Sequence, residues 1–157
     1  MHDEVPINRV LIAIDFTVAA SHAFYAGVSL ATKLGAETWV LHVAEPIRSF
    51  DFSKKRYIET AETIERVEEG LHRRLNELWR EGGLEAVDRR KVHLVVRGGK
   101  AAAEILATAR AKDVDLIVLG SSDVGGLSSA LGSTSEKVAR GAHCSVFCVR
   151  GGARTTE

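Results

Sequence analysis

Five short apolar runs alternate along the chain with longer segments in which apolar residues recur at helical spacing. The first run is apolar on both faces and is too short for a helix, which predicts a buried parallel strand. The other four have similar length and apolar content. The five predicted strands are "RVLIAID" (9–15), "ETWVLHVAE" (37–45), "KVHLVVR" (91–97), "VDLIVLG" (114–120) and "SVFCVR" (145–150).

Four helices are predicted between these strands. The segment 18–34 has one apolar face and ends before Gly35, and a long amphipathic helix is expected at 57–80, ended by Gly82 and Gly83. Shorter helices are expected at 100–112 and 134–142, and "PIRSFDFSKK" (46–55) is predicted to be a polar loop. The face of the first helix comprises Ala20, Ala23, Phe24, Gly27, Leu30, Ala31 and Leu34, and the stripe of the second comprises Ile58, Ala61, Ile64, Val67, Leu71, Leu75 and Leu78.

Alternation of strands and helices predicts an α/β fold, with an open doubly wound parallel sheet and helices on both faces. In such sheets a ligand binds beyond the carboxyl ends of the strands, where the winding direction reverses. The first predicted strand ends in Asp15 and the fourth in Gly120. If these strands are neighbours, their two ends flank one crevice.

Composition narrows the class of protein. The 157 residues carry 21 basic and 21 acidic side chains with no basic block, which gives no reason to expect nucleic-acid or membrane binding. The start of the chain has no apolar leader pattern, and the longest uncharged run, 16–32, is shorter than the roughly 20 apolar residues of a spanning helix. Cys144 and Cys148 have neither zinc nor redox spacing and are expected to be buried free thiols. We therefore expect a cytoplasmic protein.

The stretch "LGSSDVGGLSSALGSTSEKV" (119–138) has the layout of a phosphate-binding loop, because it leads from an apolar strand through Gly and Ser residues into a helix. The chain has no P-loop, and "DFTVAAS" after the first strand is neither a dinucleotide fingerprint nor a flavodoxin-type phosphate loop. The third strand ends in Arg97 and Gly98, which excludes a response-regulator receiver. The candidate loop therefore lies after the fourth strand, and this position is unusual among nucleotide folds.

Five motifs in order resemble the universal stress protein family over about 140 residues of the chain, which is roughly the length of one domain. The first strand has the family's aspartate followed by a Ser or Thr, here Asp15 and Thr17, and the second has its "LHV". "VVRGGKAAAEILATARAKDVDLIVLGS" and "GSTSEKVARGAHCSVFCV" are similar to the family's later strands and helices. The resemblance implies one adenine-nucleotide alpha-hydrolase-like domain at 1–151, with strand order 3-2-1-4-5, followed by a polar tail at 152–157.

ATP-binding members of that family carry G-x2-G-x9-G-[ST] after the fourth strand. In this chain the first glycine is Gly120, the second position holds Asp123, and the third glycine is Gly132, one residue early and followed by Ser133. The resemblance implies ATP or AMP as ligand, with a divalent metal only alongside the nucleotide. The implied nucleotide-binding residues are Ala13, Asp15, Val43, Leu119, Gly120, Gly126, Gly132, Ser133 and Thr134.

Several of these residues also have a structural interpretation. The Asp15 carboxylate either accepts a hydrogen bond from a ribose hydroxyl or the adenine amine, or helps to hold a metal, or caps the following helix with or instead of Thr17. Ser133 and Glu136 form the S-x-x-E pattern of a capping box. Asp123 is either a turn residue or a ligand for a phosphate-bound metal, and without a metal its charge opposes triphosphate binding. His42 is expected to be a core histidine.

No catalytic or metal-binding arrangement is recognised in the sequence. We therefore expect a small regulatory protein of the stress response that binds an adenine nucleotide and acts through partners. The alternative is a dimeric interaction module that has lost nucleotide binding. A slow enzyme that hydrolyses ATP or transfers a nucleotide is a third hypothesis. The last strand, 145–150, should be an apolar sheet edge, and the resemblance implies a homodimer joined there.

Overall fold

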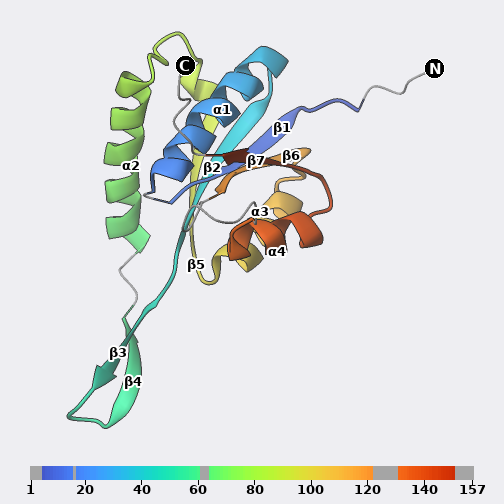
Figure 1. Ribbon diagram of the computed structural model, residues 1–157. Coiled ribbons are helices and arrows are strands. Elements are labelled where there is room, and N and C mark those ends of the chain that lie inside the picture. The colour runs from blue at the N-terminus through green and yellow to red at the C-terminus, as the bar shows by residue number, and fades with distance from the viewer. Residues whose placement is uncertain (1–4, 16, 61–63, 122–130, 151–157) are drawn as a thin grey trace, which may run out of the picture.

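The computed structural model describes residues 5–15, 17–60, 64–121 and 131–150 of the chain. Its main sheet has five parallel strands in the order β5-β2-β1-β6-β7. Counted among the predicted strands this order is 3-2-1-4-5, so the predicted fold class and strand order are confirmed (Figure 1). The strand bounds are β1 Arg9–Ala13, β2 Glu37–Ala44, β5 Val92–Gly98, β6 Leu116–Ser121 and β7 Ser145–Arg150.

Two helices cover each face of this sheet (Figure 1). One buried cluster joins the sheet to α1 (Val18–Leu34) and α2 (Ile64–Glu81). The other joins it to α3 (Ala101–Ala111) and α4 (Ser133–Gly141). A 3₁₀ turn, η1 (Arg89–Lys91), precedes β5. Apart from Arg9 at the start of β1 and Ser121 at the end of β6, these two inner strands have no polar side chain, because both of their faces are covered.

The first helix matches its predicted bounds. Its C-cap, Gly35, has φ +65°, a left-handed conformation that glycine adopts without steric cost. The predicted apolar face is largely buried, but Leu34 is exposed and Val28 is buried in its place. Leu34 is the last residue of α1.

The segment predicted as a polar loop and the first turns of a helix is instead a β-hairpin. Strand β3 (Ile47–Asp51) pairs antiparallel with β4 (Arg56–Thr60), and α2 begins only at Ile64. The turn forms because the Asp51 carboxylate accepts hydrogen bonds from the backbone N–H groups of Ser53 and Lys54. The helical prediction for 57–60 was therefore wrong, because the backbone of these residues forms its hydrogen bonds with β3 instead. The predicted stripe residue Ala61 lies outside the described residues.

Within the described part of the chain, none of the helices combines the length and apolar character needed to cross a membrane.

Candidate functional site

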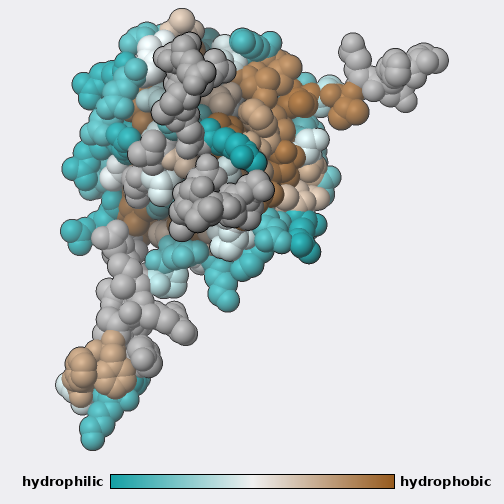
Figure 2. Space-filling view, in the orientation of Figure 1, coloured by the Kyte–Doolittle hydropathy of each residue, from teal (hydrophilic) through white to brown (hydrophobic). Residues whose placement is uncertain are grey.

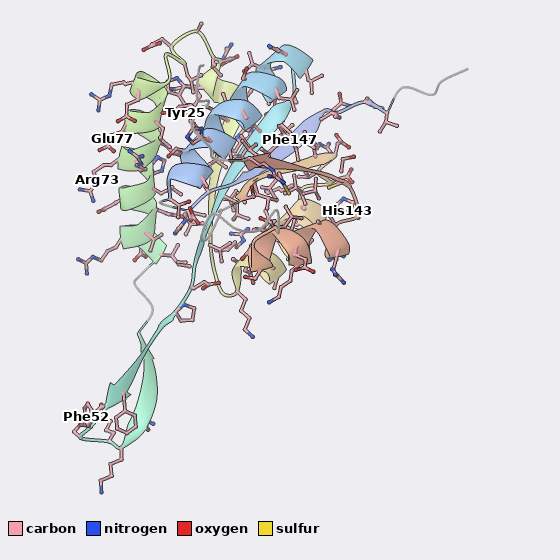
Figure 3. The ribbon with its side chains drawn as sticks, viewed as in Figure 1. Tyr25, Phe52, Arg73, Glu77, His143 and Phe147 are labelled. Atoms are coloured by element: carbon pink, nitrogen blue, oxygen red, sulfur yellow. The ribbon has the colours of Figure 1, made fainter. Side chains whose placement is uncertain are left out.

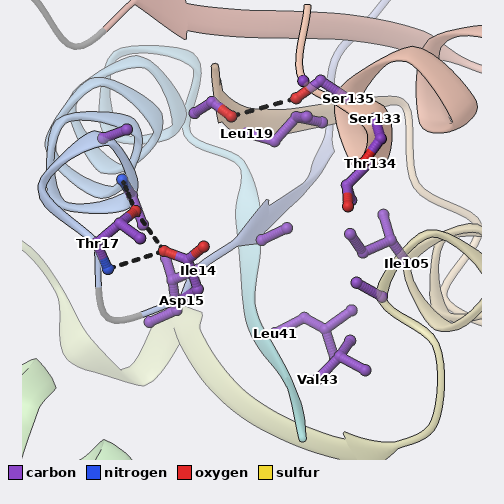
Figure 4. Close-up of a pocket in the computed structure, with 16 residues that line it drawn as sticks. Ile14, Asp15, Thr17, Leu41, Val43, Ile105, Leu119, Ser133, Thr134 and Ser135 are labelled. Carbon is purple, nitrogen blue, oxygen red and sulfur yellow. Dashed lines mark hydrogen bonds between the residues drawn. The ribbon is translucent and has the colours of Figure 1, made fainter. Parts of the chain in front are cut away.

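A cavity of about 190 Å³ lies beyond the carboxyl ends of β1 and β6 (Figure 4). These are the neighbouring strands at which the winding direction of the sheet reverses, the usual position of a ligand site in an open α/β fold. The floor is formed by Leu41 and Val43 of β2 and by Ile105 of α3. The first turns of α1 and α4 lie on opposite sides of it.

The cavity brings together every predicted nucleotide-binding residue that the structure describes. Ala13 and Asp15 line it from the end of β1, Val43 from β2, and Leu119 and Gly120 from β6. A second group lines it from the start of α4, namely Gly132, Ser133 and Thr134. The remaining predicted residue, Gly126, lies outside the described residues, as does Asp123.

Asp15 supports the start of α1 as well as facing the cavity (Figure 4). Its Oδ1 atom accepts hydrogen bonds from the backbone N–H of Thr17 at 2.9 Å and from the Thr17 hydroxyl at 2.5 Å. Thr17 is the N-cap, and its Oγ1 accepts from the N–H of Ala20 at 3.2 Å. No hydrogen bond to Asp15 Oδ2 is found among the described residues. Asp15 therefore supports the helix start indirectly, by holding the N-cap Thr17. Its Oδ2 atom is left for a ligand.

Gly120 has a packing reason to be glycine. A Cβ atom at this position would lie 2.6 Å from the backbone oxygen of Ala19, because the first turn of α1 passes directly over the end of β6. Real Cβ atoms essentially never make so short a contact. The glycine is required by the approach of helix to strand, whether or not a phosphate also lies there.

The start of α4 differs from the predicted capping box. The N-cap is Gly132, and it makes no side-chain hydrogen bond to the helix. Ser133 is the first helical residue, and the Glu136 carboxylate accepts from Arg140 at 2.8 Å, one turn later. The capping-box prediction was wrong because the helix starts one residue earlier than the pattern requires. The first-turn N–H groups therefore border the cavity without a capping side chain.

Ser135 is a site residue that sequence reasoning missed. It lines the cavity, is 3% exposed, and its hydroxyl donates to the backbone oxygen of Gly120 at 3.2 Å. The only sequence signal is a third hydroxyl residue in "STSEK", which does not by itself distinguish a buried serine from an exposed one.

The charges of the lining are few. Among the described lining residues Asp15 is the only charged side chain, and the others are apolar or carry hydroxyl groups. Two features favour an anion, namely the uncapped N-terminus of α4 and the hydroxyls of Ser133 and Thr134. The arrangement offers N–H and O–H donors to a phosphate on one side and one carboxylate to a hydroxyl or amine on the other.

The histidine and cysteine predictions are largely met. His42 is buried in β2, and its Nδ1 lies 3.0 Å from the backbone oxygen of Ile14, as expected for a core histidine. Cys144 and Cys148 are free and partly buried, and burial raises the pKa of both thiols. In the described ranges no three His, Cys, Asp or Glu side chains are grouped so that they could hold a metal ion.

Comparison with solved structures supports the fold. The universal stress protein UspA from Lactobacillus plantarum has a TM-score of 0.69 at 21% identity, over 94% of this chain and 100% of that one. A universal stress protein in complex with cAMP has a TM-score of 0.63 at 18% identity, over 92% and 97%. A universal stress protein from Archaeoglobus fulgidus in complex with dAMP has a TM-score of 0.52 at 18% identity, over 93% and 99%.

Sequence comparison identifies the family. Universal stress protein YxiE of Bacillus subtilis is 32% identical over 153 residues, which cover 91% of this chain and 99% of the relative. A universal stress protein of Methanocaldococcus jannaschii is 26% identical over the same share of this chain and 82% of its own length. The model of the universal stress protein family matches residues 6–150, from before β1 to the end of β7. The chain therefore belongs to the universal stress protein family.

Proposed function

We propose that this protein binds an adenine nucleotide in the β1/β6 cavity and acts through protein partners in a stress response rather than by turnover. One observation carries the proposal: all the described residues that the family motif implicates line a single cavity at the switch point of the sheet. The relatives solved with cAMP and dAMP support an adenine nucleotide as the ligand class.

The chemistry of the walls orients the ligand. The apolar side chains of Ala13 and Val43 suit the faces of an adenine ring, and the unengaged oxygen of Asp15 suits a ribose hydroxyl or the adenine amine. The phosphate is assigned to the start of α4, where uncapped N–H groups and the hydroxyls of Ser133 and Thr134 are found.

The same walls favour a monophosphate over a triphosphate. The described lining has no Lys or Arg to balance the charge of a triphosphate. We therefore expect AMP or cAMP to bind more tightly than ATP in the absence of Mg²⁺.

Calorimetric titration with adenosine, AMP, cAMP and ATP, each with and without Mg²⁺, tests this proposal. Ser133→Asp is the informative variant, because a carboxylate at the helix start favours α4 but repels a phosphate. It should weaken AMP binding at least tenfold and leave adenosine binding unchanged. The control Lys137→Gln lowers the net charge by the same one unit, but on the exposed face of the same helix, and should not change AMP binding. The absence of heat, together with no shift in melting temperature at millimolar nucleotide, would reject the proposal and leave the interaction module as the alternative.

We also propose a homodimer joined through β7. In the described sheet β7 is an edge strand, and Phe147 on it is 43% exposed (Figure 3). Light scattering at high salt, which screens ionic contacts elsewhere on the surface, should give twice the chain mass for the unmodified protein and the mass of one chain for Phe147→Glu. A monomer at micromolar concentration before any substitution contradicts this part of the proposal.

A further inference from the structure

The β3–β4 hairpin, residues 47–60, extends away from the body of the protein (Figures 1 and 2). We call it the hairpin arm. Its two strands form a separate two-stranded sheet, in which they pair only with each other. An isolated two-stranded hairpin is marginally stable in water. A surface that covers the arm would therefore stabilise it.

The tip of the arm combines aromatic and basic side chains. Phe52 is 84% exposed, and its ring lies 5.1 Å from that of Phe50 in an edge-to-face contact (Figure 3). Lys54, Lys55 and Arg56 follow and are all exposed. The one acid, Asp51, accepts hydrogen bonds from Ser53 and Lys54 within the turn, and its Oδ2 also lies 3.9 Å from Lys54 Nζ, which leaves a net positive charge at the tip. The tip therefore presents apolar surface next to positive charge, and suits an acidic partner surface that has an apolar spot.

The start of α2 has that chemistry. Ile64 is 49% exposed, and Glu65, Glu68 and Glu69 around it are exposed as well. Ile64 and Glu68 are four residues apart, so they lie on the same face of the helix. The basic side chain of Arg66 reduces but does not cancel the negative charge. Acidic residues also favour a helix start by themselves, so charge alone does not decide what they contact.

The length of the arm decides whether its tip can contact the α2 start of its own chain or only that of a second copy. Each strand of the arm has five residues, so at roughly 3.3 Å per residue the tip lies about 16 Å from the base. The chain enters α2 from the base, only a few residues after Thr60. The tip therefore lies far from the α2 start of its own chain. In a two-fold pair with antiparallel arms, each tip would meet the α2 start of the other copy.

We propose that the hairpin arm binds the start of α2 in a second copy of this chain, with Phe52 against Ile64 and Lys54 and Lys55 against Glu65 and Glu68. This contact is distinct from the β7 edge and does not depend on nucleotide binding.

Charge reversal and mixing test the proposal. All proteins in this test, the parent included, carry Phe147→Glu, so that association through β7 does not contribute. Lys54→Glu with Lys55→Glu makes both surfaces acidic, whereas Glu65→Lys with Glu68→Lys makes both basic. Each variant alone should give the mass of one chain by light scattering at low salt, where the parent gives twice that mass. An equimolar mixture should recover the doubled mass, because each arm then faces an opposite charge. Added salt should dissociate both the parent and the mixture.

A matched control separates local from general charge effects. Glu77→Lys with Glu81→Lys makes the same charge change at the far end of α2 and should keep the doubled mass. Phe52→Ser tests the apolar part of the contact and should weaken association at least tenfold, with circular dichroism unchanged.

Three results would overturn the proposal. The first is a parent of one-chain mass at micromolar concentration and low salt. The second is a mixture that stays at one-chain mass when the parent doubles. The third is binding of the parent to vesicles of anionic phospholipid that is lost in Phe52→Ser without any change in mass, which would reassign the arm to a membrane surface.

Discussion

The hydroxyl of Ser135 donates a hydrogen bond of 3.2 Å to the backbone oxygen of Gly120 and so joins the first turn of α4 to the carboxyl end of β6. Both residues line the cavity. Because Ser135 is nearly fully buried, its hydroxyl needs a partner within the protein, and a partner on β6 holds α4 at a defined distance from the strand. The Ser135 side chain thus helps to position the wall that offers the helix N–H groups, together with the buried Val138.

Replacing Ser135 by alanine should destabilise the protein by about 1 kcal/mol, because the Gly120 carbonyl loses a buried donor. Urea unfolding followed by circular dichroism measures the loss. Ser29→Ala is the control, since Ser29 is exposed on α1 and its removal should change stability by less than about 0.5 kcal/mol. Equal effects of the two substitutions would contradict a structural role for the Ser135 hydroxyl.

Gly120→Ala should cost about 1–3 kcal/mol, because the new Cβ would lie 2.6 Å from the oxygen of Ala19 and the helix or strand must shift. Gly70→Ala, in the middle of α2, provides a matched comparison. A Cβ there meets no atom within 4 Å, and alanine should stabilise the helix by about 0.5–1 kcal/mol. The same urea unfolding experiment measures the change in stability of both glycine variants. If Gly120→Ala is as stable as the parent, the close approach of α1 to β6 is wrong.

Thr17→Ala should destabilise the protein by about 1 kcal/mol, since it removes the N-cap of α1 and the hydroxyl that donates to Asp15. For a domain of this size the melting temperature should fall by roughly 2–4 °C. Thr17→Ser keeps the hydroxyl and should melt close to the parent. A serine variant as unstable as the alanine variant would show that the methyl group, rather than the cap, matters at this position.

Most of the sheet and its helices could be predicted from the sequence because the local signals agree with the tertiary structure. Helix α1 is an example, since an apolar face and a terminal glycine, Gly35, coincide. The hairpin arm could not be predicted in this way. Its strands mix aromatic and charged residues without strict alternation, and its turn depends on the Asp51 side chain rather than on a glycine pair.

The candidate site was predictable to the extent that it depends on topology. Asp15 follows β1 and Gly120 lies near the end of the adjacent strand β6, so their meeting at one cavity follows from the strand order. The helix start was not predictable in detail, because a shift of one residue moves the N-cap from Ser133 to Gly132 and frees Glu136 to pair with Arg140. Sequence patterns locate a helix end only to within one or two residues, whereas a capping role depends on which residue stands at the N-cap position itself.

The thiols of Cys144 and Cys148 should react slowly in the folded protein. Both pack into the cluster on the α3/α4 side of the sheet, and burial raises the pKa of each, with the charge of Asp115 also raising that of Cys144. The reactive thiolate is therefore scarcer than in an unfolded chain. At about pH 8, alkylation by iodoacetamide should be several-fold slower in the native protein than in denaturant. Native and denatured protein that react at equal rates would show that the thiols are not shielded by the sheet.

The raised pKa values of Cys144 and Cys148 also make the stability of the protein depend on pH. As the pH rises, the unfolded chain loses the two thiol protons before the folded protein does. The stabilisation from the neutral thiols is therefore complete below about pH 8.5 and decreases above it. Replacing both cysteines by alanine should reduce this alkaline loss of stability.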